Sequence, residues 1–302
     1  MKKTALFIFF LMALFGASFA AGNWQRKSRL VSNRSSEGTF LDNRFIPTRY
    51  PTVNRPFVIF VVGYNNGAAV EKTLHSIFSQ HYAHFRLIYV DDGSSDGSFS
   101  LAQDLIHSYQ HVAPVTVLRN EERFGEMANL YAVIQSCQDE EIVVVLGGED
   151  WLAHEWVLSR LNEYYADPDL WLTYGQYREF PTYREGACRP IKRSEGRGFR
   201  DHPFVASHLK TFYAGLFKKI PESDFSLQGH FLTAGADLAT MIPLLEMGVK
   251  HFQFIPETLY IANRQNPTRE EREQIVRSER FVRSLPPYAP IDSFLERLGT
   301  HE

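Results

Sequence analysis

Hydrophobic residues in the first half of the chain alternate between continuous runs and helically spaced positions. Continuous apolar runs cover residues 57–62 (FVIFVV), 87–90 and 142–146, and a further strand is predicted over 115–118 (VTVL). Between the first two runs, Val70, Leu74, Ile77 and Phe78 recur at helical spacing, and further helices are predicted over about 99–109 and 125–136. Runs without polar alternation are typical of strands buried on both faces of a parallel sheet. The pattern therefore predicts βαβ units in an α/β, doubly wound sheet flanked by helices.

The second half of the chain has a less regular pattern. It predicts helices over 151–165, 237–247 and 268–284, and strands over 170–174 and 252–255. The segment 181–204 is rich in Arg, Gly and Pro. It is interpreted either as a loop over a site or as a surface loop without a binding role.

The first twenty residues have the pattern of a signal peptide. Two lysines precede an apolar run from Ala5 to Phe15, and small residues follow up to Ala20. The run is shorter than the roughly 20 residues that span a bilayer. Basic residues at 26–34 oppose translocation of the following chain, so a membrane tether with a cytosol-facing domain stays an alternative. We expect an exported or membrane-associated protein.

These patterns divide the chain into four parts. They are a signal peptide over 1–20, a polar N-terminal arm over 21–54, an α/β domain over 55–265, and a charged C-terminal helical tail over 266–302.

Composition and charge exclude several classes of protein. The 302 residues include 32 Lys and Arg against 35 Asp and Glu, which gives a formal charge of −3 and no basic excess for a nucleic-acid partner. Only two cysteines, Cys137 and Cys188, are present, which excludes a disulfide scaffold and a Cys₄ zinc site. A bond between these two is not established by the sequence.

Polar residues follow each of the first four predicted strands. They are residues 63–66 (GYNN), 91–96 (DDGSSD), 120–125 (NEERFG) and 147–150 (GGED). Ligands of open α/β sheets bind outside the carboxyl ends of the strands. The chain lacks GxGxxG and GxxxxGK[ST] motifs, which excludes the commonest dinucleotide and P-loop sites. Carboxylates at this edge suit ring N–H donors and a divalent cation, so we expect a nucleoside diphosphate with Mg²⁺ or Mn²⁺.

The segment from Gly63 to Ser98 resembles the opening of the family-2 glycosyltransferases of the GT-A fold. Its YNN, its SQ before the second strand and its DDGSSDGS match that family in order and spacing. The resemblance is strong from about Arg55 to Leu152 and weaker to about Asn266. It implies a GT-A fold with a mixed sheet, and a metal-assisted transferase acting on a nucleotide-sugar donor.

The resemblance also implies roles for residues at the donor site. Tyr64 and Asn65 would flank the nucleoside, and Asp91 or Asp92 would read the edge of the base, usually uracil. Asn120 and Gly125 would line the groove, and Arg264 would contact the diphosphate. The alternatives are structural. The acidic segment 91–96 also suits an Asx-type turn, and Asn120 and Gly125 suit an ordinary loop and helix start.

The fourth strand departs from the family pattern. The family has a DxD element, often LDGDDW, where this chain reads LGGEDW from Leu146 to Trp151. The first Asp has become Gly147, and the metal-binding Asp has become Glu149. Glu149 is still an oxygen ligand, and Asp150 would share its role after a one-residue shift. Weaker metal binding or loss of turnover would follow from this change.

The catalytic base implied by the family lies in the second half. An inverting transfer needs a carboxylate that takes the proton of the acceptor hydroxyl. Asp237, in TAGADLATMIPLLEMG from Thr233 to Gly248, stands where the family has this Asp, although an Asp there also suits a helix cap. His208 and Lys210 precede it in SHLKTF, where either would reach phosphate or simply pack.

Together these inferences predict an inverting glycosyltransferase that uses a nucleotide-diphosphate sugar, with UDP favoured. The acceptor would be a glycan, a lipid or a protein, and membrane association would come through the N-terminus. The first alternative is a catalytically inactive GT-A-fold protein that binds a nucleotide or a glycan. The second is a nucleotidyltransferase, for which Gly147 removes one of the paired metal carboxylates it would need.

Overall fold

The computed structural model describes residues 53–191, 198–263 and 267–294. The chain divides into two units, Met1–Tyr50 and Pro51–Glu302, and the second contains every described element. The predicted signal peptide, most of the predicted N-terminal arm and Arg264 lie outside the described residues.

The centre of the second unit is a nine-stranded mixed sheet with the path order β3-β2-β1-β4-β8-β6-β11-β5, in which β7 pairs with β6. Its strands are β1 Phe57–Gly63, β2 Phe85–Asp91, β3 Val115–Arg119, β4 Ile142–Gly147, β5 Trp151–Leu152, β6 Leu172–Phe180, β7 Arg184–Glu185, β8 Thr211–Tyr213 and β11 Phe252–Asn263. Strands β3, β2, β1 and β4 are parallel to one another, whereas β8 pairs antiparallel with both β4 and β6. Strands β9 Ser226–Leu227 and β10 His230–Phe231 form a separate hairpin.

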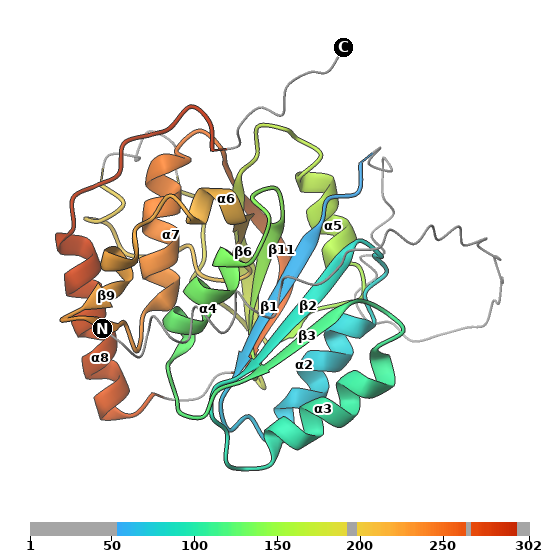
Figure 1. Ribbon diagram of the computed structural model, residues 1–302. Helices are drawn as coiled ribbons and strands as arrows, with labels where there is room; N and C mark the ends of the chain where they lie inside the picture. The colour runs from blue at the N-terminus through green and yellow to red at the C-terminus, as the bar shows by residue number, and fades with distance from the viewer. Residues whose placement is uncertain (1–52, 192–197, 264–266, 295–302) are drawn as a thin grey trace. The chain divides into compact units, whose positions relative to one another are not determined.

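Helices lie on both faces of this sheet (Figure 1). They are α2 Ala69–Phe78, α3 Ser98–Tyr109, α4 Glu126–Gln135, α5 Val157–Tyr164, α6 Ala214–Phe217, α7 Ala236–Met247 and α8 Arg269–Ser284, with a 3₁₀ turn at Glu222–Phe225. Helices α2 and α3 pack together on one face, and α4, α6 and α7 lie on the other, with α8 outside α7 (Figure 1). The doubly wound arrangement predicted from the hydrophobic pattern is confirmed.

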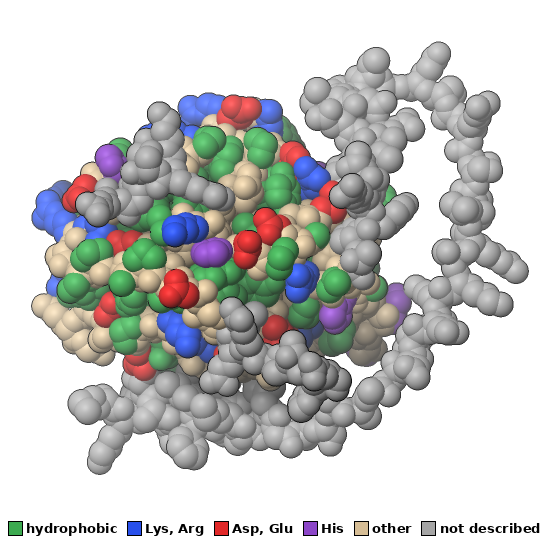
Figure 2. All heavy atoms as spheres, turned by 90° about the horizontal axis from the view of Figure 1, so that it is seen from above, with side chains coloured by type: hydrophobic (Ala, Val, Ile, Leu, Met, Phe, Trp, Pro, Cys, Tyr) green, Lys and Arg blue, Asp and Glu red, His purple; other side chains and the backbone are tan. Residues whose placement is uncertain are grey.

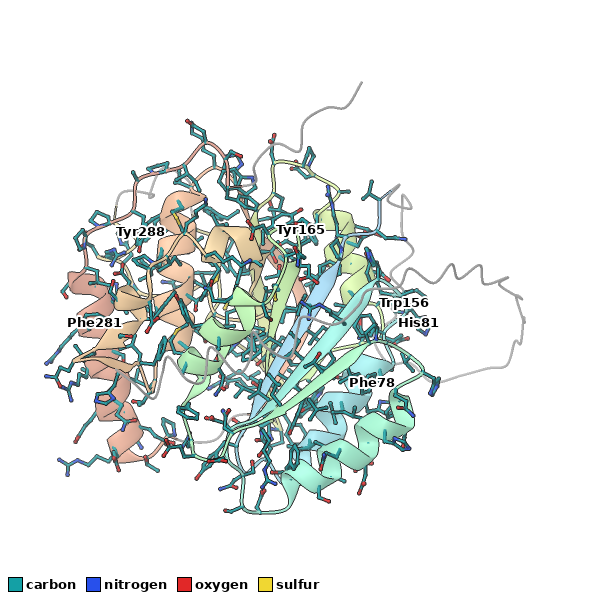
Figure 3. All side chains as sticks on the ribbon, viewed as in Figure 1. Phe78, His81, Trp156, Tyr165, Phe281 and Tyr288 are labelled. Carbon is teal, nitrogen blue, oxygen red and sulfur yellow. The ribbon has the colours of Figure 1, made fainter. Side chains whose placement is uncertain are left out.

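The interior is built from the apolar runs that predicted the strands. Five consecutive residues of β1, from Phe57 to Val61, are at most 1% exposed, because helices cover both faces of that strand. Burial of one such side chain contributes about 1.5–3 kcal/mol to folding. At the rim, His81 packs edge-on against Trp156 with ring centroids 4.3 Å apart (Figure 3), which closes the turn after α2.

The predicted helix over 151–165 is wrong over its first six residues. Trp151 and Leu152 form β5, which pairs antiparallel with Ile261 and Tyr260 of β11, and α5 begins only at Val157. The predicted strands at 170–174 and 252–255 are the beginnings of β6 and β11, which pair in parallel and extend to Phe180 and Asn263.

The predicted tail helix is confirmed as α8. It begins with a capping box, in which the Thr268 hydroxyl accepts from the Glu271 backbone N–H while the Glu271 side chain accepts from that of Thr268. None of the helices in the described part of the chain is both long and apolar enough to cross a bilayer.

The visible surface agrees with the near-neutral composition. In the view of Figure 2, acidic and basic side chains are interspersed with hydrophobic ones. The two cysteines are free and buried. Cys137 lies 3.5 Å from an Arg86 nitrogen, and Cys188 Sγ lies 3.3 Å from the Ser207 hydroxyl.

Candidate functional site

The loops that follow β1, β2, β3 and β4 meet at one edge of the sheet. Three backbone hydrogen bonds join them: Asp92 N to Gly63 O at 2.8 Å, Asn120 N to Asp91 O at 2.8 Å, and Gly148 N to Val62 O at 3.0 Å. Because the four strands are parallel, their carboxyl ends all lie on this side. The polar residues that follow these strands are therefore neighbours in space.

Both oxygens of the Asp92 carboxylate accept hydrogen bonds from other parts of the chain. Its Oδ1 accepts hydrogen bonds from the Asn120 and Asn129 side-chain amides and from Phe124 N, at 2.8–2.9 Å, and its Oδ2 accepts from Gly125 N at 2.8 Å. The side chain is 2% exposed. Asp92 thus fixes the 120–125 loop and the start of α4, and it places Asn120 and Gly125 as its own partners.

Asp91 has a different environment. It is completely buried, and its Oδ2 accepts from Ser94 N at 3.1 Å, with Arg119 Nε at 3.5 Å. Its Oδ1 is buried and has no hydrogen-bond partner among the described residues. A buried carboxylate oxygen without a donor is unfavourable, so this atom suits a donor supplied by a ligand. Oδ2 closes the predicted Asx-type turn, and Oδ1 is the oxygen that the predicted binding role would need.

Tyr64 and Asn65 lie beside this turn. Asn65 N donates to Ser94 Oγ at 3.0 Å, and Asn65 Oδ1 accepts from Ser95 N at 2.9 Å, so Asn65 joins the β1 and β2 loops. Tyr64 is 40% exposed, and the Arg123 guanidinium lies 4.1 Å from the centre of its ring. No sequence pattern predicted this contact of Arg123.

Packing explains why residue 147, in the LGGEDW segment 146–151, is a glycine. A Cβ on Gly147 would lie 2.6 Å from Asp150 Oδ2 and 3.4 Å from the Tyr260 hydroxyl. The Asp150 carboxylate therefore occupies the space that a side chain at position 147 would need. It is held there by the Tyr260 hydroxyl, which donates to Oδ2, and by Asn263 N, which donates to Oδ1 at 2.7 Å.

Glu149 is half-buried next to other carboxylates. Burial raises its pKa to about 7, and the negative charges of Asp150 and Glu271 add to this effect. Within residues 53–191, 198–263 and 267–294, no three His, Cys, Asp or Glu side chains are grouped so as to hold a metal ion. Glu149 and the adjacent Asp150 fit a divalent cation whose other ligands come from a bound substrate. A cation beside Glu149 would favour the charged form of its carboxylate.

Asp237 lies in the first turn of α7, next to a buried ammonium group. Lys210 Nζ donates to Asp237 Oδ1 and lies 3.6 Å from Glu126 Oε1 at the start of α4. The other oxygen, Oδ2, is 3.9 Å from His208 Nε2. Because the Asp237 side chain is 28% exposed, it is still reachable from outside.

Contacts connect the Asp237 carboxylate to the LGGEDW segment 146–151. The His208 ring stacks on the Tyr260 ring with centroids 4.5 Å apart, and the Tyr260 hydroxyl binds Asp150. On the other side, Glu126 directly follows Gly125, which donates to Asp92. The segments carrying Asp92, Asp150 and Asp237 therefore belong to one contiguous cluster. Arg264 lies outside the described residues.

The sequence analysis missed Glu126, and it named Lys210 as a phosphate contact or a packing residue without predicting its contact with Asp237. Predicting that these two residues meet would have required knowing that β8 pairs with β4, which brings residue 210 beside Val145. Three-residue strands such as β8 give almost no periodic signal of their own.

The fold and the site can be compared with known proteins. The family model described as glycosyl transferase family 2 matches residues 58–220, which is just over half of the chain. An uncharacterized protein of Mycobacterium tuberculosis, MT1568, is 30% identical over 115 residues, which cover 38% of this chain and 34% of that protein.

Solved structures share the fold at low sequence identity. TarS of S. aureus matches with a TM-score of 0.55 and 16% identity over 74% of this chain and 39% of TarS. TarS 1–349 in complex with UDP-GlcNAc matches with a TM-score of 0.53 and 15% identity, over 70% of this chain and 60% of that one. The mannosyltransferase PcManGT from Pyrobaculum calidifontis, in complex with GDP-Man and Mn²⁺, gives 0.55 and 19% identity over 79% of this chain and 67% of that one. The GT-A fold expected from the sequence is confirmed. This chain spans about a third of MT1568 and about two fifths of TarS.

Proposed function

The chain belongs to glycosyltransferase family 2, and we propose that it transfers a sugar from a nucleoside-diphosphate donor to an acceptor hydroxyl with inversion of configuration. The observation that carries this proposal is the single cluster at the carboxyl edge of the sheet. It contains a buried carboxylate oxygen, on Asp91, that has no hydrogen-bond partner in the described part of the chain, and a partly exposed carboxylate at a helix start, on Asp237. The first suits a nucleobase and the second suits an acceptor hydroxyl.

A uracil base fits the Asp91 environment better than guanine does. Oδ2 already accepts from Ser94 N, so among the residues that the structure describes only Oδ1 lacks a partner. Uracil offers one ring N–H between two carbonyl groups, whereas guanine offers an N–H and an amino group side by side, which suit two carboxylate oxygens. Tyr64, exposed beside this turn, would flank the nucleoside. UDP-GlcNAc bound to TarS 1–349 and GDP-Man bound to PcManGT show that this fold takes both kinds of donor.

A divalent cation, Mg²⁺ or Mn²⁺, would be held through Glu149, with Asp150 beside it. The cluster carries the carboxylates of Glu126, Glu149, Asp150 and Asp237 but one buried ammonium, on Lys210, so a diphosphate would meet an excess of negative charge. When bound, such a cation stabilises the negative charge that builds up on the leaving diphosphate. The Mn²⁺ present with PcManGT supports this part of the proposal.

The protein groups have separate tasks in the transfer. Asp237 Oδ2 takes the proton of the acceptor hydroxyl while the acceptor oxygen bonds to the anomeric carbon. The bond from that carbon to the phosphate oxygen breaks, and the diphosphate leaves with the electron pair. A single displacement of this kind inverts the configuration.

Binding and turnover together test this function. The chain is mixed with UDP, GDP, UDP-glucose, UDP-N-acetylglucosamine and GDP-mannose, with and without Mn²⁺, and the Kd and the release of nucleotide are measured. We expect metal-dependent binding of UDP and slow hydrolysis of a UDP-sugar when water is the acceptor. Binding without any turnover would favour a nucleotide-binding protein that has lost catalysis, the alternative that Gly147 supports.

Replacing Asp91 by Asn is expected to weaken UDP binding about tenfold. An Asn has one acceptor and two donors, so either Ser94 N or the uracil N–H would face an amide N–H instead of an oxygen. Isothermal titration calorimetry with UDP measures the effect. An unchanged Kd in a correctly folded variant would place the base elsewhere.

Replacing Glu149 by Ala is expected to remove the metal dependence of UDP binding and to lower the affinity at saturating Mn²⁺ by about tenfold or more. Glu155→Ala is the matched control, because Glu155 is exposed at the turn before α5. A Kd for UDP that still responds to Mn²⁺ as in the wild type would clear Glu149 of a ligand role.

We also propose that the N-terminal segment directs the protein to a membrane or beyond it, with a glycan, lipid or protein as the acceptor. The basis is the apolar run from Ala5 to Phe15 and the basic residues after it. Protease protection of a chain tagged at its C-terminus, in sealed membrane vesicles of known orientation, distinguishes export from a cytosol-facing tether.

A further inference from the structure

A lysine lies buried in the centre of the carboxylate cluster. Lys210 is 2% exposed and directly precedes β8, where its backbone carbonyl accepts from Val145 N at 3.3 Å. Its ammonium group touches Asp237 and lies 3.6 Å from Glu126. An ammonium group buried this fully is retained only where charged partners compensate its loss of water. Two helices, α4 and α7, supply these partners.

The contact with Lys210 makes the two oxygens of Asp237 unequal. Oδ1 accepts from the ammonium group, whereas Oδ2 faces His208 Nε2 at 3.9 Å. The His208 ring has a fixed position, since it stacks on Tyr260 and meets the Tyr177 ring edge-on with centroids 5.0 Å apart. Two polar atoms 3.9 Å apart can both reach one hydroxyl oxygen at ordinary hydrogen-bond distance.

We propose that Lys210 is the positioning residue of the catalytic base: it holds Asp237 as the anion and leaves Oδ2 as the oxygen that takes the acceptor proton beside His208. This inference rests on the proposed function, in which Asp237 is the base. Lys210 itself stays out of the proton transfer, because its ammonium group is paired with the Asp237 and Glu126 carboxylates and its side chain is closed off from solvent.

The charged surroundings of the pair agree with this role. Burial lowers the pKa of the Lys210 ammonium, while the carboxylates of Glu126 and Asp150 oppose that shift. The groups that face Asp237 are Lys210 and His208 from the segment before β8, with Glu126 of α4 behind the ammonium. Without the ammonium, Asp237 would lose its cationic partner and keep the negative charge of Glu126 nearby, so its protonated form would be favoured up to a higher pH.

The test uses hydrolysis of the best donor among UDP-glucose, UDP-N-acetylglucosamine and GDP-mannose, with water as the acceptor, in the full chain. Lys210→Met is expected to lower kcat about 10- to 100-fold and to move the acidic limb of the pH–rate profile upward by about one pH unit, with the Kd for UDP unchanged. Lys218→Met is the matched control, because Lys218 also pairs with an aspartate, Asp139 at 2.8 Å, outside the site. It should change none of these quantities.

A double-mutant cycle separates positioning from general structural support. If Lys210 acts through Asp237, Lys210→Met should add little to the loss already caused by Asp237→Asn. Additive losses, or an unshifted pH profile in an active Lys210→Met, would overturn the inference while leaving the proposed function intact. If Lys210→Met does not fold, Lys210→Gln takes its place in the same cycle. No turnover by the wild-type chain with any of the three donors would overturn the proposed function and this inference together.

Discussion

Replacing Asp237 by Asn is expected to lower the rate of sugar transfer about a thousandfold while the Kd for UDP stays within about twofold of the wild-type value. Asn has nearly the same shape as Asp, and its amide oxygen can still accept from the Lys210 ammonium. It cannot take a proton from an acceptor hydroxyl. The nucleotide, in our proposal, is held by the β1 and β2 loops and by the carboxylates after β4, so its affinity should not depend on this residue.

Single-turnover transfer or hydrolysis of the UDP-sugar, followed by nucleotide release, measures this effect, and calorimetry measures the Kd. Asp169→Asn serves as the control, since Asp169 is an exposed aspartate just before β6 begins, at the amino end of that strand. Turnover that survives in Asp237→Asn would assign the base to another group in the cluster, of which His208 and Glu126 are the nearest candidates. Loss of UDP binding in this variant would instead mean that Asp237 supports the donor site.

The sequence predicted the first half of the fold more accurately than the second, for a physical reason. Strands β1, β2 and β4 are mostly buried, so each one contains a continuous apolar run. The edge strand β3 is only partly buried, and the ends of all four strands lie within one or two residues of the predicted limits. By contrast, β5 has only two residues, and its conformation is fixed by pairing with β11, more than a hundred residues later. A local hydrophobic pattern does not show pairing with a strand so far away in the sequence, so Trp151 and Leu152 were assigned to the following helix.

The candidate site divides in the same way. The sequence identified which residues follow the strands, because parallel strands bring their carboxyl ends to one edge. It did not distinguish Asp91 from Asp92, since the difference lies in hydrogen bonds from Ser94 on one side and from the 120–129 segment on the other. Nor did it pair Lys210 with Asp237, which are 27 residues apart and meet only after β8 has joined the sheet.

Replacing Gly147 by Asp would restore the residue that the family pattern has at this position, yet we expect it to destabilise the protein by about 3 kcal/mol and to weaken UDP binding. A Cβ at position 147 would lie 2.6 Å from Asp150 Oδ2, a distance that requires one of the two groups to move. Overpacking of this kind costs about 1–3 kcal/mol. A second carboxylate beside Asp150 adds repulsion between like charges.

Urea unfolding of Gly147→Asp and Gly147→Ala separates these two contributions. Ala introduces the steric conflict alone, so it should show most of the loss of stability, and the further loss in Asp measures the repulsion. The double variant Gly147→Asp/Asp150→Ala should recover part of the stability, because it removes the carboxylate that fills the space, although Tyr260 and Asn263 N would then lose their acceptor. If Gly147→Asp alone were as stable as the wild type and turned over faster with Mn²⁺, the Asp150 carboxylate would have to move easily. In that case Gly147 would mark the loss of a metal-binding carboxylate. The packing around it indicates instead that the residue is a glycine because the Asp150 carboxylate fills the space beside it.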